Sequence, residues 1–178
     1  MKLQLIAASF LFSAMSVFAV PAAALMEALS INTLVQASDS VVRGEVRAME
    51  TQWDSSGTQI LTVATIRVDQ DYMEGVSDEL ITVVYPGGEL DGLIMMVSDS
   101  VELTVGEDVI IFLEKDQAIS GQPYFVVVGS AQGKYAIGLD GNVQTPRFLL
   151  QGEQSSENRQ LSEDDLVRQI TDALSNQR

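Results

Sequence analysis

The sequence predicts a mainly β protein: an antiparallel β-barrel or sandwich of about seven strands, flanked by a short N-terminal helix and a C-terminal amphipathic helix. Three apolar runs carry this prediction, at residues 79–85, 93–97 and 109–113. Glycine-containing turns separate the runs, as is typical of strands joined by short connections. We expect these runs to be the central strands of the domain.

Residues 1–24 have the pattern of a secretory signal peptide. Lys2 provides the positive charge, and an apolar segment follows from Leu3 to Ala19. Small residues then occur at the spacing that signal peptidases cleave, in Val17-Phe18-Ala19 and in Ala22-Ala23-Ala24. The alternative is an N-terminal membrane anchor, but the apolar segment is short for a span of about 20 residues. We therefore expect a secreted or periplasmic protein without a membrane span once the signal is removed.

A short helix and a long hairpin are predicted to open the mature chain. The helix is expected over residues 25–37, with Ser30 able to cap a turn that begins at Ile31. The first strand is expected over residues 40–49, where apolar and charged residues alternate. Its inward face would hold Val42, Gly44, Val46 and Ala48. A glycine there permits a bulge or the close approach of another strand.

The turn Asp54-Ser55-Ser56-Gly57 predicts a hairpin into a second strand over residues 59–69. One face of that strand would hold Ile60, Thr62, Ala64, Ile66 and Val68. Near the C-terminal end of the domain, residues 124–128 and 134–139 are expected to pair as a last hairpin around residues 129–133.

The C-terminal part of the chain predicts a polar linker over residues 151–160 and a helix over residues 161–178. Ser162 is a good N-cap, Asp165 occupies the capping-box position, and Leu161 and Leu166 have the spacing of a hydrophobic staple. The apolar stripe of this helix either packs on its own domain or is offered to a partner, and we favour the first.

The composition excludes several classes of function. The 178 residues contain no Cys and no His. Disulfides, thiolate nucleophiles, Ser-His and Cys-His triads and the common zinc sites are therefore ruled out. With 25 acidic and 10 basic residues the net charge is −15, which disfavours nucleic acid and favours a protein partner with a basic surface.

No stretch of the sequence has the pattern of a catalytic or metal site. Residues 129–135 resemble a phosphate-binding loop only superficially, because the glycines are too close and Tyr135 follows the lysine. Carboxylates at Asp54, Asp69, Asp71, Asp91 and Asp99 do not follow a calcium-loop pattern. Paired carboxylates leave a hydrolase open as an alternative. We expect no enzyme, no cofactor and no metal.

The candidate binding site is the glycine-rich loop over residues 86–92. Glycines allow a ligand backbone to approach, and the methionines that follow make adaptable contacts. The candidate residues are Gly87, Gly88, Glu89, Leu90 and Asp91, with Trp53 as a neighbour. The structural alternative, which we favour for residues 86–97, is a wide turn leading into an ordinary core strand.

The order of these features resembles two groups of proteins. The segments are Ser38–Val46, Thr65–Gly75, Ile81–Tyr85 and Val105–Leu113. Together they resemble the netrin-like domain, the OB-type barrel of the tissue inhibitors of metalloproteinases. Over residues 30–140 the layout "VxGxV … GG … GExVxxFL … GxxQGK" is similar to that of secreted bacterial proteins of unknown role.

The resemblance implies an OB-like β-barrel over residues 25–150, but not the inhibitors' chemistry. Those inhibitors chelate the protease zinc through an N-terminal cysteine, and this chain has no cysteine. We therefore expect a secreted or periplasmic, non-enzymatic protein-binding module. A modulator of a secreted metallopeptidase and a carboxylate-based hydrolase are the alternatives.

Overall fold

The computed structural model describes residues 28–116, 123–144 and 161–177. The predicted signal peptide and the predicted linker lie outside these residues. The elements in chain order are α1 (Ile31–Gln36), β1 (Ser40–Trp53), β2 (Ile60–Asp71), β3 (Leu80–Pro86), β4 (Gly88–Leu90), β5 (Leu93–Met95), β6 (Asp108–Asp116), β7 (Tyr124–Val127), the 3₁₀ turn η1 (Ser130–Gly133), β8 (Lys134–Ile137), β9 (Val143–Gln144) and α2 (Glu163–Ser175).

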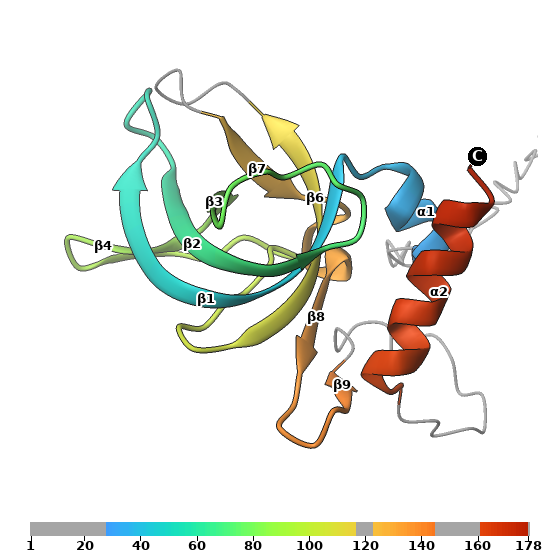
Figure 1. Ribbon diagram of the computed structural model, residues 1–178. Helices are drawn as coiled ribbons and strands as arrows, with labels where there is room; N and C mark the ends of the chain where they lie inside the picture. Colours follow the sequence, from blue (N-terminus) through green and yellow to red (C-terminus); the bar gives the residue numbers. More distant parts are fainter. Residues whose placement is uncertain (1–27, 117–122, 145–160, 178) are drawn as a thin grey trace, which may run out of the picture.

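The main sheet closes into a barrel, which confirms the predicted fold class. Its strands follow the order β1-β2-β3-β7-β6, and β6 pairs back onto β1 (Figure 1). All of these pairs are antiparallel except β3 with β7, which are parallel at Val83 and Phe125. A five-stranded Greek-key barrel of this kind is the architecture expected of an OB-like domain.

Strand β1 bends sharply so that it can pair with both β2 and β6. Gly44 lies at the bend, and a Cβ there would be 2.2 Å from the carbonyl oxygen of Arg67. The predicted close approach of another strand at this glycine is therefore confirmed. A second register shift lies between Val46 and Ala48. It turns Ala48 to solvent and Met49 toward the core, so the predicted inward position of Ala48 is wrong.

The predicted final hairpin is also wrong. Strands β7 and β8 do not pair with each other; both pair with β6, on the edge opposite β1. β7 pairs with the second half of β6, and β8 pairs with the first half. The 3₁₀ turn η1 connects β7 to β8. The amide of Val128 still donates to the carbonyl of Phe112 at 2.9 Å, so the two short strands lie end to end along one edge.

Two hydrophobic cores explain the uninterrupted apolar run in β6. Val109, Ile111 and Leu113 point into the barrel, whereas Ile110 and Phe112 point toward the helices. A strand buried on both faces has no need to alternate with polar residues. The second core contains α1 and α2, which pack together on the side of the barrel away from the β4–β5 hairpin (Figure 1).

Both helices begin where their caps predicted. The Ser30 hydroxyl accepts from the amide of Thr33, and the Ser162 hydroxyl accepts from the amide of Asp165. The first helix is shorter than predicted. The apolar stripe of α2 is buried at Leu166, Ile170 and Ala173, so this helix packs on its own domain. Within the described ranges, no helix has both the length and the hydropathy to cross a bilayer.

Candidate functional site

Among the described residues, several exposed large apolar side chains gather on and directly after the β4–β5 hairpin, which projects from the barrel on the side opposite the helices (Figure 1). The register pairs Gly88 with Met95, Glu89 with Ile94 and Leu90 with Leu93. These strands form a separate two-stranded sheet. The expectation that residues 93–97 are a core strand is therefore wrong.

A two-residue turn closes this hairpin. Asp91 and Gly92 both have positive φ, at 53° and 78°. This is the pattern of a type I′ turn, for which Asp-Gly is a preferred pair. An Asp-Gly pair between Leu90 and Leu93 is therefore the signal in the sequence that could have identified the hairpin.

The base of the hairpin is fixed to the barrel by three hydrogen bonds. The amide of Gly87 donates to the carbonyl of Ile60 at 2.9 Å. The buried hydroxyl of Thr62 donates to the carbonyl of Gly87 at 2.7 Å, and the hydroxyl of Ser100 donates to the carbonyl of Pro86 at 2.8 Å. The chain therefore leaves β3 in a defined direction.

Gly88 allows the hairpin to lie directly on the β1–β2 ribbon. Its φ is 130°, and a Cβ there would be 2.7 Å from Thr62 Oγ1 and 2.8 Å from Thr51 Cγ2. The hydroxyl of Thr51 donates to the carbonyl of Glu89 at 2.7 Å. This close approach of the protein's own backbone accounts for the glycine at position 88 without any ligand.

Four exposed apolar side chains lie on β5 or directly after it, and we call them the apolar crest: Leu93, Ile94, Met96 and Val97. Their exposed fractions are 57%, 71%, 90% and 37%. Leu90 and Met95 are half-buried, and Gly88 faces the barrel, as the alternation of a strand requires. The crest therefore includes four residues that were absent from the predicted site.

The predicted site residues divide between the crest's surroundings and the hairpin's base. Glu89 and Asp91 are exposed beside the crest, whereas Gly87 is buried beneath it. Trp53 is 38% exposed at the end of β1, on the same strand as Thr51. Trp53 pairs with Ile60, whose carbonyl accepts from the amide of Gly87, so its strand position is next to the base of the hairpin.

The neighbouring β1–β2 turn is held by Asp54. Its carboxylate accepts from the amides of Thr58 and Gln59 at 2.7 and 2.9 Å and from the hydroxyl of Ser56 at 2.6 Å. The Ser56 hydroxyl is the largest cause that lowers the pKa of Asp54 to about 2, followed by the amide of Gln59. This carboxylate is occupied in shaping the turn.

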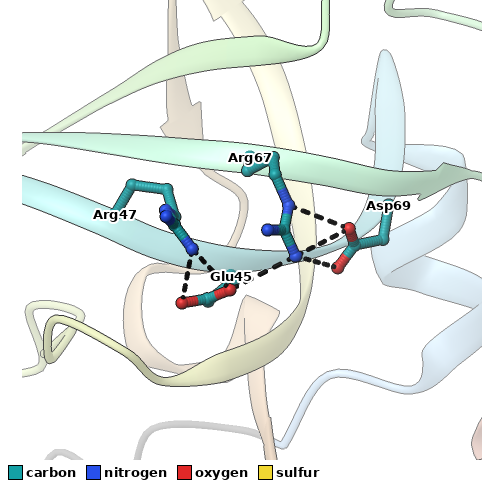
Figure 2. A network of polar contacts seen from close by, with 4 residues as sticks. All are labelled: Glu45, Arg47, Arg67 and Asp69. Atoms are coloured by element: carbon teal, nitrogen blue, oxygen red, sulfur yellow. Dashed lines mark hydrogen bonds and ion pairs between the residues drawn. The ribbon is translucent and has the colours of Figure 1, made fainter.

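Several positive charges in the described residues pair with carboxylates away from the crest. On the outer face of β1 and β2, Glu45 contacts Arg47 at 2.9 Å and Arg67 at 3.2 Å, and Arg67 also contacts Asp69 (Figure 2). The hydrogen bond to Asp69 is the main cause that raises the pKa of Arg67. These arginines neutralise carboxylates on β1 and β2.

Two further cations pair with carboxylates elsewhere in the fold. Arg43 Nε lies 3.0 Å from Glu163 Oε1 at the start of α2, as an ion pair without hydrogen-bond geometry. Lys134 pairs with Glu107 where β8 meets the turn before β6. The sequence from residue 68 to residue 114 contains twelve Asp and Glu and no Lys or Arg. The chain segment that carries the crest is therefore acidic.

The described residues offer little else as a site. They contain no group of three or more Asp or Glu placed to hold a metal ion. A cavity of about 290 Å³ lies between the loop after β2 and the end of α2, lined by Tyr72, Met73, Glu74, Leu174 and Gln177. It contains none of the predicted site residues.

No family model, curated protein or solved structure matches this chain. The resemblance to the netrin-like domain therefore stays a prediction.

Proposed function

We propose that the protein is a non-enzymatic protein-binding module that works in the periplasm or outside the cell, and that it binds its partner through the apolar crest. One observation carries the proposal: Ile94 and Met96 are 71% and 90% exposed on a hairpin that is firmly anchored to a closed barrel. Contiguous apolar side chains on an ordered projection are typical of protein interaction sites.

The crest can make a substantial contribution to the free energy of binding. Fully burying one large aliphatic side chain is worth about 1.5–3 kcal/mol. Ile94 and Met96 together would contribute about 3–6 kcal/mol, which is roughly a 10²- to 10⁴-fold effect on affinity. Methionine also adapts to different apolar surfaces, which suits position 96 in a binding site.

The location rests on the N-terminal segment. The charge at Lys2, the apolar run that follows and the small residues up to Ala24 support export through a cleaved signal peptide. The excess of acidic residues favours a partner with a basic surface.

The test compares three forms of the full-length chain, tagged and exported in its native host. The first is unchanged. The second carries Ile94→Thr and Met96→Thr in the crest. The third carries Leu80→Thr and Leu139→Thr, which alter exposed apolar residues outside the crest.

After chemical cross-linking and mass spectrometry, we expect the same protein to be captured by the unchanged chain and the third form. Capture by the crest variant should fall at least about tenfold, because it loses most of the apolar contact. Equal capture by all three forms would show that the crest is not the binding surface. A captured metallopeptidase would favour the alternative that the resemblance raised.

A further inference from the structure

Within the residues that the structure describes, the outer edge of β5 has backbone hydrogen-bonding groups without a partner strand. In a hairpin closed by a two-residue turn, the closing pair Leu90–Leu93 exchanges hydrogen bonds and the next pair, Glu89–Ile94, does not. The amide and carbonyl of Ile94 therefore point away from β4. The same alternation directs the carbonyl of Glu89 away from β5, and that carbonyl accepts from Thr51 at 2.7 Å.

The two edges of the hairpin are consequently different. The outer edge of β4 contacts β1, because the Glu89 carbonyl accepts a hydrogen bond from the Thr51 hydroxyl. In the part of the chain that the structure describes, β5 pairs with β4 alone. Natural proteins usually protect such an edge with a charge, a proline or a bulge. Residues 93–97, Leu-Ile-Met-Met-Val, contain no charged residue and no proline.

The charges around this edge indicate which kind of strand would add to it. Glu89 and Asp91 precede β5 and Asp99 follows the crest, and all three are exposed. A second copy of this chain would bring a second set of the same carboxylates to this edge, and like charges repel. A segment with Lys or Arg beside its apolar residues would instead meet complementary charge.

Building on the proposed function, we infer that the partner contributes an extended apolar segment flanked by Lys or Arg, which adds to β5 as a third strand of the β4–β5 sheet. The backbone of Ile94 supplies hydrogen bonds to that segment, as in other cases of strand addition. The side chains of Ile94 and Met96 cover its apolar residues on the outer face.

The test uses a defined probe, the labelled peptide acetyl-Lys-Lys-Val-Thr-Ile-Thr-Val-Lys-Lys-amide, and fluorescence anisotropy with the full-length protein. One matched peptide has Glu in place of every Lys. Another carries N-methyl groups on the central Ile and the following Thr, so that one donor facing β5 is lost in either register. We expect binding of the first peptide and at least about tenfold weaker binding of both others, since one backbone hydrogen bond is worth about 1 kcal/mol and N-methyl groups also obstruct pairing.

Two protein variants distinguish the contribution of the Ile94 backbone amide to binding from that of its side chain. Ile94→Pro removes the outward amide, which β4 does not use, and proline is tolerated at such an edge position. Ile94→Thr keeps the amide and removes apolar surface. We expect Ile94→Pro to bind the peptide at least about fivefold more weakly than Ile94→Thr, while Leu139→Thr binds as the unchanged protein does. Circular dichroism of each variant checks that the barrel is folded.

Several outcomes would overturn strand addition. These are no binding of the Lys peptide at about 1 mM, equal binding of the N-methylated peptide, or equal effects of the Pro and Thr substitutions. If the crest still captures its native partner in those cases, the proposed function stands and the mode of binding is wrong. If the crest variant captures the native partner as well as the unchanged chain does, both the proposed function and strand addition are refuted. A dimer in sedimentation equilibrium that Ile94→Pro abolishes would make a second copy the occupant, which also overturns the inference.

Discussion

Replacing Gly88 by alanine should detach the β4–β5 hairpin from the barrel. Gly88 has a φ of 130°, which an L-residue adopts only with strain. The added Cβ would be 2.7 Å from Thr62 Oγ1 and 2.8 Å from Thr51 Cγ2. The hydroxyls of these two threonines donate to the carbonyls of Glu89 and Gly87, so neither side chain can move away without weakening a hydrogen bond that holds the hairpin.

The expected cost follows from these two effects. A residue held in a sparsely populated backbone region costs about 1–3 kcal/mol. Losing two hydroxyl-to-carbonyl hydrogen bonds costs about 0.5–1.5 kcal/mol each. The sum, about 2–6 kcal/mol, is a large part of the 5–15 kcal/mol by which a domain is typically stable.

Urea unfolding measures the effect, with the fluorescence of Trp53 as the probe because it is the single tryptophan in the sequence. Gly92→Ala is the matched control: its φ is also positive, at 78°, but nothing lies within 4 Å of the added Cβ. We expect the control to lose only about 1–2 kcal/mol, the cost of the left-handed backbone. Hydrogen exchange at the Gly87 amide, which bonds to Ile60, should accelerate in Gly88→Ala.

The reasoning would be refuted if Gly88→Ala and Gly92→Ala lost the same stability and Gly87 remained equally protected. That result would mean that the hairpin does not rest on Thr51 and Thr62.

Three other predictions concern the barrel and its ionisable groups. Gly44→Ala should lower stability by about 3 kcal/mol or more in thermal unfolding, because the new Cβ lies 2.2 Å from the Arg67 carbonyl; an unchanged Tm would contradict the strand contact. The pKa of Asp54 is lowered to about 2, so its contribution to stability is complete above pH about 4 and is lost as the pH falls toward 2. In an NMR titration Ser56→Ala should raise this pKa, and no change would exclude the hydroxyl as its cause. Burial raises the pKa of Tyr135 to about 12, so its contribution is lost as the pH rises from about 10 to 12. An ultraviolet titration should show one tyrosine that ionises at an unusually high pH, and Tyr135→Phe should remove this transition. If the transition persists in the variant, it belongs to another tyrosine.

Local chemistry explains where reading the sequence succeeded. The cap at Ser162 depends on its own hydroxyl and an amide three residues later, and the structure has that bond. The inward position of Gly44 follows from the two-residue period of a strand. The mainly β barrel was predictable because short apolar runs between turns favour strands.

Residues 93–97 show where sequence reading failed. An apolar run is buried only if another part of the chain packs over it. The periodicity of the sequence does not indicate whether a neighbouring strand covers the run. The base of the hairpin is set by Thr51 and Thr62, which come from strands far away in the sequence. From the sequence, the glycine at position 88 could have served either the approach of a ligand or the packing of the protein's own backbone. Only its neighbours in the fold distinguish the two.

The sequence by itself determined the fold class, the helix caps, the first hairpin and the glycine at the bend of β1, because each depends on neighbours along the chain or on strand alternation. Only the tertiary structure decided that β7 and β8 lie end to end beside β6, that α2 packs on its own domain, and that the crest at Ile94 and Met96 faces solvent. These features depend on pairing between distant segments, whose free energy comes from contacts that no local pattern records.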